Sequence, residues 1–178
     1  MKSLILAVPL AMLIASAAHA QPAPYNCQND PVRVDIRAQA LPTALDALSR
    51  QTNCPISRDV DVTKLRGNAV RGRMSPANAM VALVRGTGLE AHPVRQGLAI
   101  DRSGQQEIAA RADALDRRIR VRQTAGHLTP GRANALSRQV AQVRRQAVLF
   151  ARQQGFVSAA EKASFQRTFK EIDAALKA

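Results

Sequence analysis

The sequence predicts an α+β fold in two unlike parts: a small β-α-β-β-α-β-β unit over residues 32–102, followed by an all-α segment over residues 104–178. Short runs in the first part alternate apolar and polar residues, which is typical of half-buried strands. In the second part, apolar residues recur every three or four positions, which is typical of helices. Because the pattern changes near Ser103-Gly104, we expect two packed units joined at that point.

The first part contains five predicted strands and two predicted helices. Residues 32–36 alternate apolar and charged side chains and form the first strand, and the leucines of residues 41–48 then recur at helical spacing. A second helix is expected after Ser75, which is a good N-cap, with Pro76 at its first position and its end at Gly86. The remaining strands are predicted at 55–58, 68–74, 89–94 and 98–101.

The second part predicts three helices and an internal repeat of 29 residues. Gly126 ends the first helix, Thr129-Pro130 begins the second, and Ser158 with Glu161 forms a capping box for the third. The turn at 126–129 matches the turn at 155–158, and apolar positions after the two turns correspond. All four Phe residues lie in this part. A three-helix hairpin or bundle is the main expectation, and a coiled-coil dimer is the alternative.

The first twenty residues are predicted to be a signal peptide. Lys2 precedes an apolar run over residues 4–14, and Ala18-His19-Ala20 is the small-x-small pattern that signal peptidase cuts. The run is too short for a transmembrane anchor, which is the alternative. We therefore expect cleavage after Ala20, export to the periplasm, and a linker over residues 21–31 that contains Cys27.

The two cysteines, Cys27 and Cys54, are expected to form a disulfide. An exported protein meets an oxidising compartment, in which a single pair of cysteines is normally bridged. A redox or metal-binding pair is the alternative, but the spacing is not C-x-x-C and no histidine is near. Together with the three histidines, two cysteines are too few for an ordinary zinc site, so neither a metal nor another cofactor is predicted.

The chain is strongly basic, with 26 Lys and Arg against 13 Asp and Glu and a formal charge of +13. Removing Lys2 with the signal peptide leaves +12, of which +8 lies in residues 104–178. Export argues against nucleic acid as a partner, and an aromatic content of 3% argues against base-stacking surfaces. Anionic envelope polymers, lipid head groups or an acidic protein are the expected partners. A merely solvated surface is the alternative.

Catalytic groups are sparse, and the sequence predicts that the chain is not an enzyme. His92 and His127 lie in different parts, without acidic residues in a triad-like context. Glu90 and Asp101 are predicted to face one another across the last hairpin, and we expect both to be exposed.

Several motifs in the first part are found together in one domain family. Residues 38–41 (Ala-Gln-Ala-Leu) end a strand, and a helix follows with the pattern A-L-x-x-L-x-x-Q-T over residues 44–52. The segment Gly86-Thr87-Gly88-Leu89 is the most specific element. The stretch over residues 32–101, and above all 53–101, resembles the secretin and TonB short N-terminal (STN) domain. Asn53-Cys54 departs from the family, which usually has a glycine after Q-T.

The resemblance implies a contact module. In the family, this domain lies on the periplasmic side of TonB-dependent transducers, where an anti-sigma regulator contacts it, and a related domain forms the periplasmic end of secretin channels. It therefore implies a periplasmic protein–protein interaction module, regulatory in signal transduction and associated with the outer membrane. The alternatives are an accessory or assembly component of a secretin or transport channel, and a binder of anionic envelope polymers through the basic helices.

Two sets of residues are candidate binding sites. The first is an exposed sheet edge at residues 56–60 or 70–73, where strand addition would leave only a weak side-chain signature. Arginine there also fits the simple protection of a strand edge. The candidate residues at this edge are Ile56, Arg58, Arg71 and Arg73. The second set is a basic face on adjoining helices, formed by Arg117, Arg118, Arg120, Arg122, Arg144 and Arg145. No oligomeric state is predicted.

Overall fold

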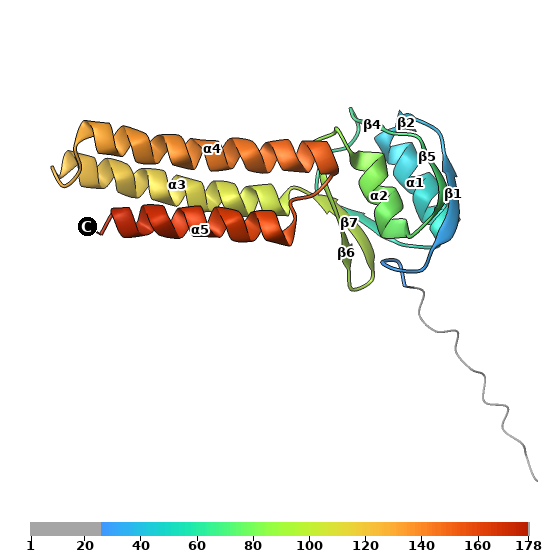
Figure 1. Cartoon of the computed structure of the whole chain (residues 1–178). Helices are drawn as coiled ribbons and strands as arrows, with labels where there is room; N and C mark the ends of the chain where they lie inside the picture. The colour runs from blue at the N-terminus through green and yellow to red at the C-terminus, as the bar shows by residue number, and fades with distance from the viewer. Residues whose placement is uncertain (1–25, 178) are drawn as a thin grey trace, which may run out of the picture.

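The computed structural model of the chain describes residues 26–177. The predicted signal peptide, with its cleavage residues Ala18 and Ala20, lies outside this range. The described chain forms two parts, which Figure 1 shows side by side: an α+β half, residues 26–102, and an elongated helical half, residues 103–177. The predicted α+β class is confirmed. Among residues 26–177, no helix combines the length and the apolar character that a membrane span requires.

The α+β half contains the five expected strands and two helices, together with two further strands of two residues each. Its elements are β1 (Val32–Ile36), β2 (Gln39–Ala40), α1 (Leu41–Thr52), β3 (Ile56–Arg58), β4 (Arg66–Gly67), β5 (Val70–Met74), α2 (Pro76–Val84), β6 (Glu90–Val94) and β7 (Gly97–Asp101). Asn68, predicted to begin a strand, instead donates its side-chain amide to carbonyls at the end of α2, so β5 begins at Val70.

Three small sheets make up the strand content. β1 pairs antiparallel with β5 to form a two-stranded ribbon, and β2 pairs with β4. The third sheet has the order β3-β7-β6, with β3 parallel to β7. The two helices lie between the β1–β5 ribbon and the three-stranded sheet (Figure 1). One apolar cluster joins all these layers, from Val34 on the ribbon through Leu45 and Met80 on the helices to Ile100 on the sheet.

A disulfide joins Cys27 to Cys54, as predicted, with their Cα atoms 5.9 Å apart. Cys54 is buried two residues after the end of α1, and the Cys27 carbonyl accepts a hydrogen bond from the Ala77 N–H of α2. The disulfide and this hydrogen bond together fasten the segment before β1 to the ends of both helices.

The helical half consists of α3 (Ser103–Thr124), α4 (Pro130–Gln154) and α5 (Ala159–Ala175). The three helices pack side by side in a bundle that projects from the α+β half (Figure 1). They enclose a separate apolar cluster. Residues at equivalent positions of the repeat, Leu136 with Phe165 and Val140 with Phe169, are all buried in it. The 29-residue sequence repeat is thus a structural repeat.

The two turns of the repeat have the same geometry at opposite ends of the bundle. Gly126 and Gly155 have φ values of +75° and +83°, and the side chains of Thr129 and Ser158 cap the helices that follow. The Gly126 turn lies at the free end. The Gly155 turn contacts the α+β half, where its carbonyl accepts the Ala91 N–H at 2.8 Å.

Candidate interaction surfaces

One edge of the β1–β5 ribbon is closed by a side chain. The amide of Gln51, on α1, accepts a hydrogen bond from the Asp35 N–H and donates one to the Asp35 carbonyl, both at 2.9 Å. The amide thus bonds to the backbone of β1 as a neighbouring strand would. Since both main-chain groups of Asp35 are occupied in this way, a second chain cannot pair with β1 at this point.

The opposite edge of the ribbon, along β5, is open. Asp35 directs its main-chain groups away from β5, so its cross-strand partner Arg71 occupies a non-hydrogen-bonded position, as does Arg73 two residues on. The N–H and carbonyl groups of these two residues therefore point outward. Arg71, Gly72 and Arg73 are exposed, and within residues 26–177 β5 pairs with no strand other than β1.

The outer face of the ribbon carries more positive than negative charge. Arg71 pairs with Asp35 across the strands at 2.8 Å, whereas Arg73 lies directly opposite Arg33, another arginine. Like charges at directly opposed positions destabilise a strand pair. These four side chains line a shallow depression of about 560 Å³. An anionic group placed there would neutralise the arginine pair.

The other predicted edge, at β3, is shorter, and its side chains are engaged in more contacts. β3 ends at Arg58, where the predicted strand ends, so the candidate edge over residues 56–60 extends two residues beyond the strand. Ile56 is half-buried against the core, and the Arg58 guanidinium forms an ion pair with Asp46 of α1. Of the two candidate edges, β5 offers the longer run of free backbone.

The structure places the predicted basic residues in more than one environment. Arg118 shares Asp173 with Arg111, and Arg144 bridges to Asp113 and Asp116 of α3, so these guanidinium groups hold helices together. At the free end of the bundle, a depression is lined by Arg117, Arg118, Val121 and Arg122, together with Lys177.

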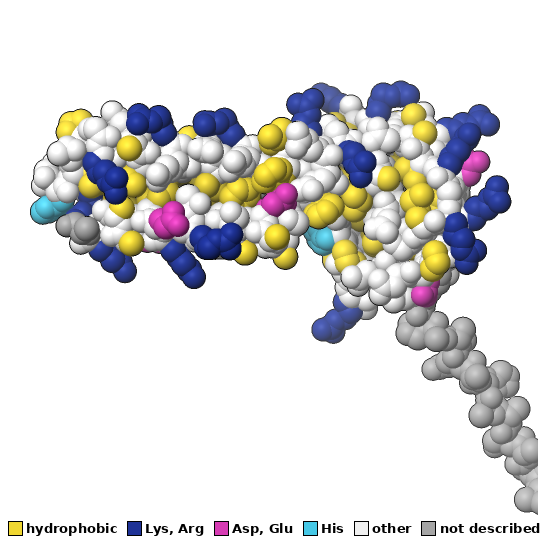
Figure 2. Space-filling view, in the orientation of Figure 1, with side chains coloured by type: hydrophobic (Ala, Val, Ile, Leu, Met, Phe, Trp, Pro, Cys, Tyr) yellow, Lys and Arg dark blue, Asp and Glu magenta, His cyan; other side chains and the backbone are white. Residues whose placement is uncertain are grey.

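Two of the six predicted arginines lie on α4. Arg144 and Arg145 line a second depression with Val148, Leu149 and Arg152. Arg120 is exposed and lines neither depression. Basic side chains stand along both outer edges of the bundle and around the α+β half, with few acidic ones on the same face (Figure 2).

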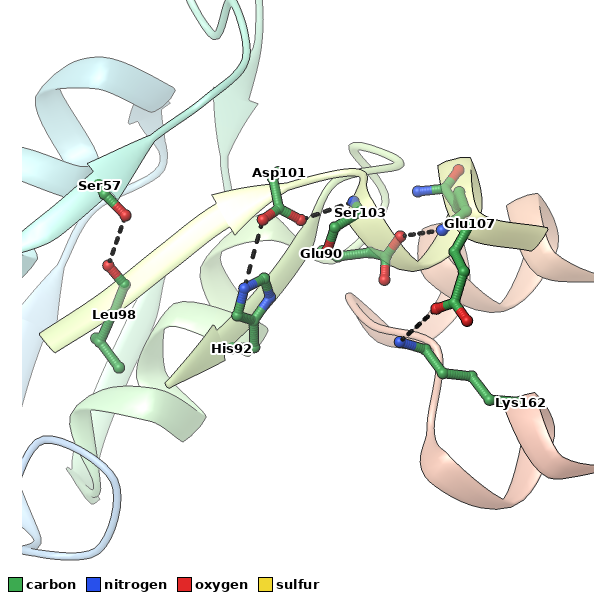
Figure 3. A network of polar contacts seen from close by, with 9 residues as sticks. Ser57, Glu90, His92, Leu98, Asp101, Ser103, Glu107 and Lys162 are labelled. Carbon is green, nitrogen blue, oxygen red and sulfur yellow. Dashed lines mark hydrogen bonds and ion pairs between the residues drawn. The ribbon is translucent and has the colours of Figure 1, made fainter. Parts of the chain in front are cut away.

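The two halves meet in a polar network at the start of α3 (Figure 3). The carboxylate of Glu90, on β6, accepts the Gln105 N–H at 2.8 Å, and that of Asp101 accepts the Ser103 N–H at 2.8 Å. Two carboxylates thus cap the positive end of the α3 dipole. The ammonium group of Lys162 lies 4.0 Å from Glu107, which links α5 to the same end of α3.

The expectation that Glu90 is exposed is wrong: it is 4% exposed, because the first turn of α3 covers it. Asp101 is its cross-strand partner and lies 3.4 Å from His92 Nε2. His127 lies exposed at the far end of the bundle, so the two histidines are not brought together. Within residues 26–177, no three His, Cys, Asp or Glu side chains are grouped as a metal site.

Three residues important to these surfaces were not singled out from the sequence: Gln51 as an edge-closing group, Glu90 as a cap, and Arg33 as the neighbour of Arg73. Gln51 lies in the Q-T motif, which carries no signal of its contact with β1. The pairing of Arg33 with Arg73 depends on strand register, which the sequence pattern leaves open between distant strands.

Comparison with known proteins gives limited similarity. No family model matches the chain, and no curated protein matches it. The ferripyoverdine receptor of the outer membrane of Pseudomonas aeruginosa, bound to ferripyoverdine, is 30% identical over 40% of this chain, with a TM-score of 0.38. A structure of FpvA from P. aeruginosa bound to a heterologous pyoverdine gives 30% identity, the same coverage and a TM-score of 0.39. The match spans 10% of each receptor chain.

Proposed function

We propose that this chain is a periplasmic protein–protein interaction module that binds an extended, acidic segment of an envelope partner along the edge of β5. The observation that carries the proposal is the open edge itself, with outward-facing backbone groups at Arg71 and Arg73 beside the opposed pair Arg33 and Arg73. The mature chain acts, on this proposal, by binding rather than by catalysis.

Strand addition accounts for both affinity and selectivity at this edge. Main-chain hydrogen bonds to Arg71 and Arg73 would hold any extended segment. An Asp or Glu side chain of that segment, placed over the ribbon, would neutralise Arg33 and Arg73 and so favour acidic sequences over neutral ones. Because Gln51 blocks the β1 edge, the partner has one place to bind on this ribbon.

The periplasmic location and the regulatory role rest on other features. The signal-peptide pattern of residues 1–20 and the Cys27–Cys54 disulfide both suit an exported protein. The resemblance of residues 32–101 to the STN domain suggests a role in envelope signalling. N-terminal sequencing of the protein from the periplasm should begin at Gln21. Cytoplasmic protein that keeps Met1 would contradict the location.

The binding proposal is tested with one charge reversal and a matched control. The tagged full chain is produced in its host, the partner that purifies with it from the periplasm is identified, and the dissociation constant is measured with both proteins purified. Arg73→Glu should weaken binding at least about tenfold, because it removes a charge from the partner site and gives Arg33 an internal partner.

Arg132→Glu provides the control. Arg132 is exposed in the first turn of α4, near the free end of the bundle, and a glutamate there would complete a capping box with Thr129. It changes the net charge as Arg73→Glu does. Equal affinities for the wild type and Arg73→Glu, or equal losses in the two variants, would contradict the proposed site.

A further inference from the structure

A groove runs along the last turns of α4 to the point where the two halves meet. At the junction, its walls are Arg85 and Gly86 after α2 and Leu149 and Arg152 of α4, around a hollow of about 640 Å³. A second hollow of about 370 Å³ continues it along α4 past Arg145. The two hollows share Leu149 and Arg152, so we treat them as one surface, the α4 groove.

Backbone hydrogen bonds fix the shape of the α4 groove. The Gly86 N–H donates to the Arg152 carbonyl at 2.7 Å, which ties the end of α2 to the last turn of α4. The side chain of Asn68 donates to the Arg85 carbonyl at 2.7 Å and to the Ala82 carbonyl at 3.1 Å. Because these contacts hold the walls in place, a ligand would meet a preformed surface.

Apolar side chains are exposed along this groove. The α4 residues that face the bundle core are buried, from Ala133 to Ala151. Val148 and Leu149 lie outside that stripe and are 54% and 46% exposed, so the packing of the bundle does not account for them. Two adjacent exposed aliphatic side chains in a shallow groove favour contact with an apolar group.

The groove is basic and carries no acidic lining residue. Arg144 is neutralised by Asp113 and Asp116, but in the described part of the chain no carboxylate lies within 4.0 Å of the guanidinium groups of Arg85, Arg145 or Arg152. The acidic side chains of the helical half are largely engaged elsewhere, in ion pairs or in the capping box of α5. The charge of the groove is therefore available to a ligand.

We infer that the α4 groove docks an acidic segment of a partner protein, with apolar side chains of that segment on Val148 and Leu149 and its carboxylates on Arg145, Arg152 and Arg85. A guanidinium group suits a carboxylate because it can donate two parallel hydrogen bonds. This site is separate from the β5 edge, and the inference does not depend on the function proposed for that edge.

Two other occupants fit less well. A second copy of the chain would bring its own strongly basic surface, at +12 for the mature chain, against the groove arginines. An anionic bilayer fits less well because the groove lacks the Trp, Tyr or Phe side chains with which interfacial helices usually insert.

The test places a photo-crosslinking amino acid, p-benzoylphenylalanine, at Leu149 of the full chain in its native host. After irradiation, mass spectrometry maps the crosslinked residue. We expect crosslinks within one stretch of another protein that is rich in Asp and Glu. Arg145→Glu with Arg152→Glu should lower the crosslink yield at least about tenfold, whereas Arg132→Glu with Arg167→Glu, the same change in net charge elsewhere on the bundle, should not.

Other results would overturn the inference. These are crosslinks to lipid, to a second copy of the chain or to a stretch without acidic residues, no crosslink above that from a buried control position, or an equal loss in both double variants. Failure at Leu149 leaves the Arg73→Glu binding result unaffected, so the two sites are judged separately.

Discussion

Single side chains that bond to distant backbone groups determine which surfaces of this chain stay open. Gln51 occupies the edge of β1, and Glu90 occupies the first turn of α3. The side-chain amide of Asn68 donates to the Arg85 carbonyl at the end of α2. Each satisfies groups that would otherwise be unpaired where regular structure ends. β5 lacks such a side chain at its outer edge among the described residues, and this difference makes it the candidate binding edge.

The contribution of the Glu90 cap can be measured directly. Glu90→Ala should lower the free energy of unfolding by about 1–2 kcal/mol, because it leaves the Gln105 N–H without its acceptor. Glu90→Gln keeps an acceptor and loses only the interaction of the charge with the helix dipole, so its cost should be smaller, about 0.3–1 kcal/mol. Urea unfolding measures both, with the exposed Glu171→Ala as control. Equal values for Glu90→Ala and Glu171→Ala would show that the cap stabilises nothing.

Asp61, in the loop after β3, makes the stability of the fold depend on pH. Hydrogen bonds from the N–H and hydroxyl groups of Thr63 hold the pKa of Asp61 below its ordinary value. The interaction therefore stabilises the fold above the unfolded-state pKa, and this contribution disappears as the pH falls through the folded-state pKa. Thr63→Val should raise the pKa of Asp61 partway, since the N–H bond remains. An NMR titration of the carboxyl carbon that shows no change would refute this account.

At the scale of elements, the β1–β5 ribbon contains an unfavourable pair, Arg33 opposite Arg73, which the proposed acidic partner would neutralise. Arg73→Glu replaces the arginine pair with a cross-strand ion pair to Arg33 and should raise the free energy of unfolding by about 0.2–1 kcal/mol. Arg73→Gln should give a smaller gain, because it removes repulsion without adding attraction. A variant that is more stable yet binds its partner less tightly is the expected signature of a binding site. A destabilised Arg73→Glu protein would show that the two side chains do not face one another.

The repeated turns of the helical half provide a matched pair of substitutions. Gly126→Ala and Gly155→Ala both place a Cβ at a left-handed φ, which costs roughly 1–2 kcal/mol. A Cβ at Gly126 meets nothing within 4 Å, whereas one at Gly155 lies 3.0 Å from the Val81 carbonyl oxygen of the other half. Gly155→Ala should therefore destabilise the chain by at least about 1 kcal/mol more in urea unfolding. Similar losses would mean that the halves do not pack tightly at this turn.

Local patterns predicted the helices and most strands because their signals lie within a few residues. The N-caps Ser75, Thr129 and Ser158 all accept the expected hydrogen bonds. The strands β2 and β4, of two residues each, have no such pattern and exist because β4 packs against both helices of the core. The sites were harder to predict, since the α4 groove and the Arg33–Arg73 pair join residues that are far apart in sequence.

At the scale of the molecule, a one-residue connection and backbone hydrogen bonds at one end of the bundle hold the two apolar cores in a fixed arrangement. Arg102 alone separates β7 from α3, and the Gly155 turn bonds to β6. The bundle therefore projects from the α+β half in a defined direction (Figure 1). The β5 edge belongs to the α+β half, whereas both halves contribute to the α4 groove, so the two proposed binding surfaces are distinct.

The disulfide between Cys27 and Cys54 anchors the N-terminal segment and stabilises the fold. Reduction of Cys27–Cys54, or the double substitution Cys27→Ala with Cys54→Ala, should lower the free energy of unfolding by about 2–4 kcal/mol, chiefly because the unfolded chain gains freedom. Denaturant unfolding with and without a reductant measures the loss. Identical midpoints under the two conditions would show that the bridge adds no stability.

Photo-crosslinking from the β5 edge tests the proposed strand addition directly. With p-benzoylphenylalanine at position 71 of the full chain, which leaves Arg33 and Arg73 in place, we predict crosslinks to consecutive residues of one acidic segment of a partner protein, because a paired strand passes along this edge. The same group at position 132, at the free end of the bundle, should give no such product. No crosslink from position 71, or the same products from both positions, would contradict strand addition at β5.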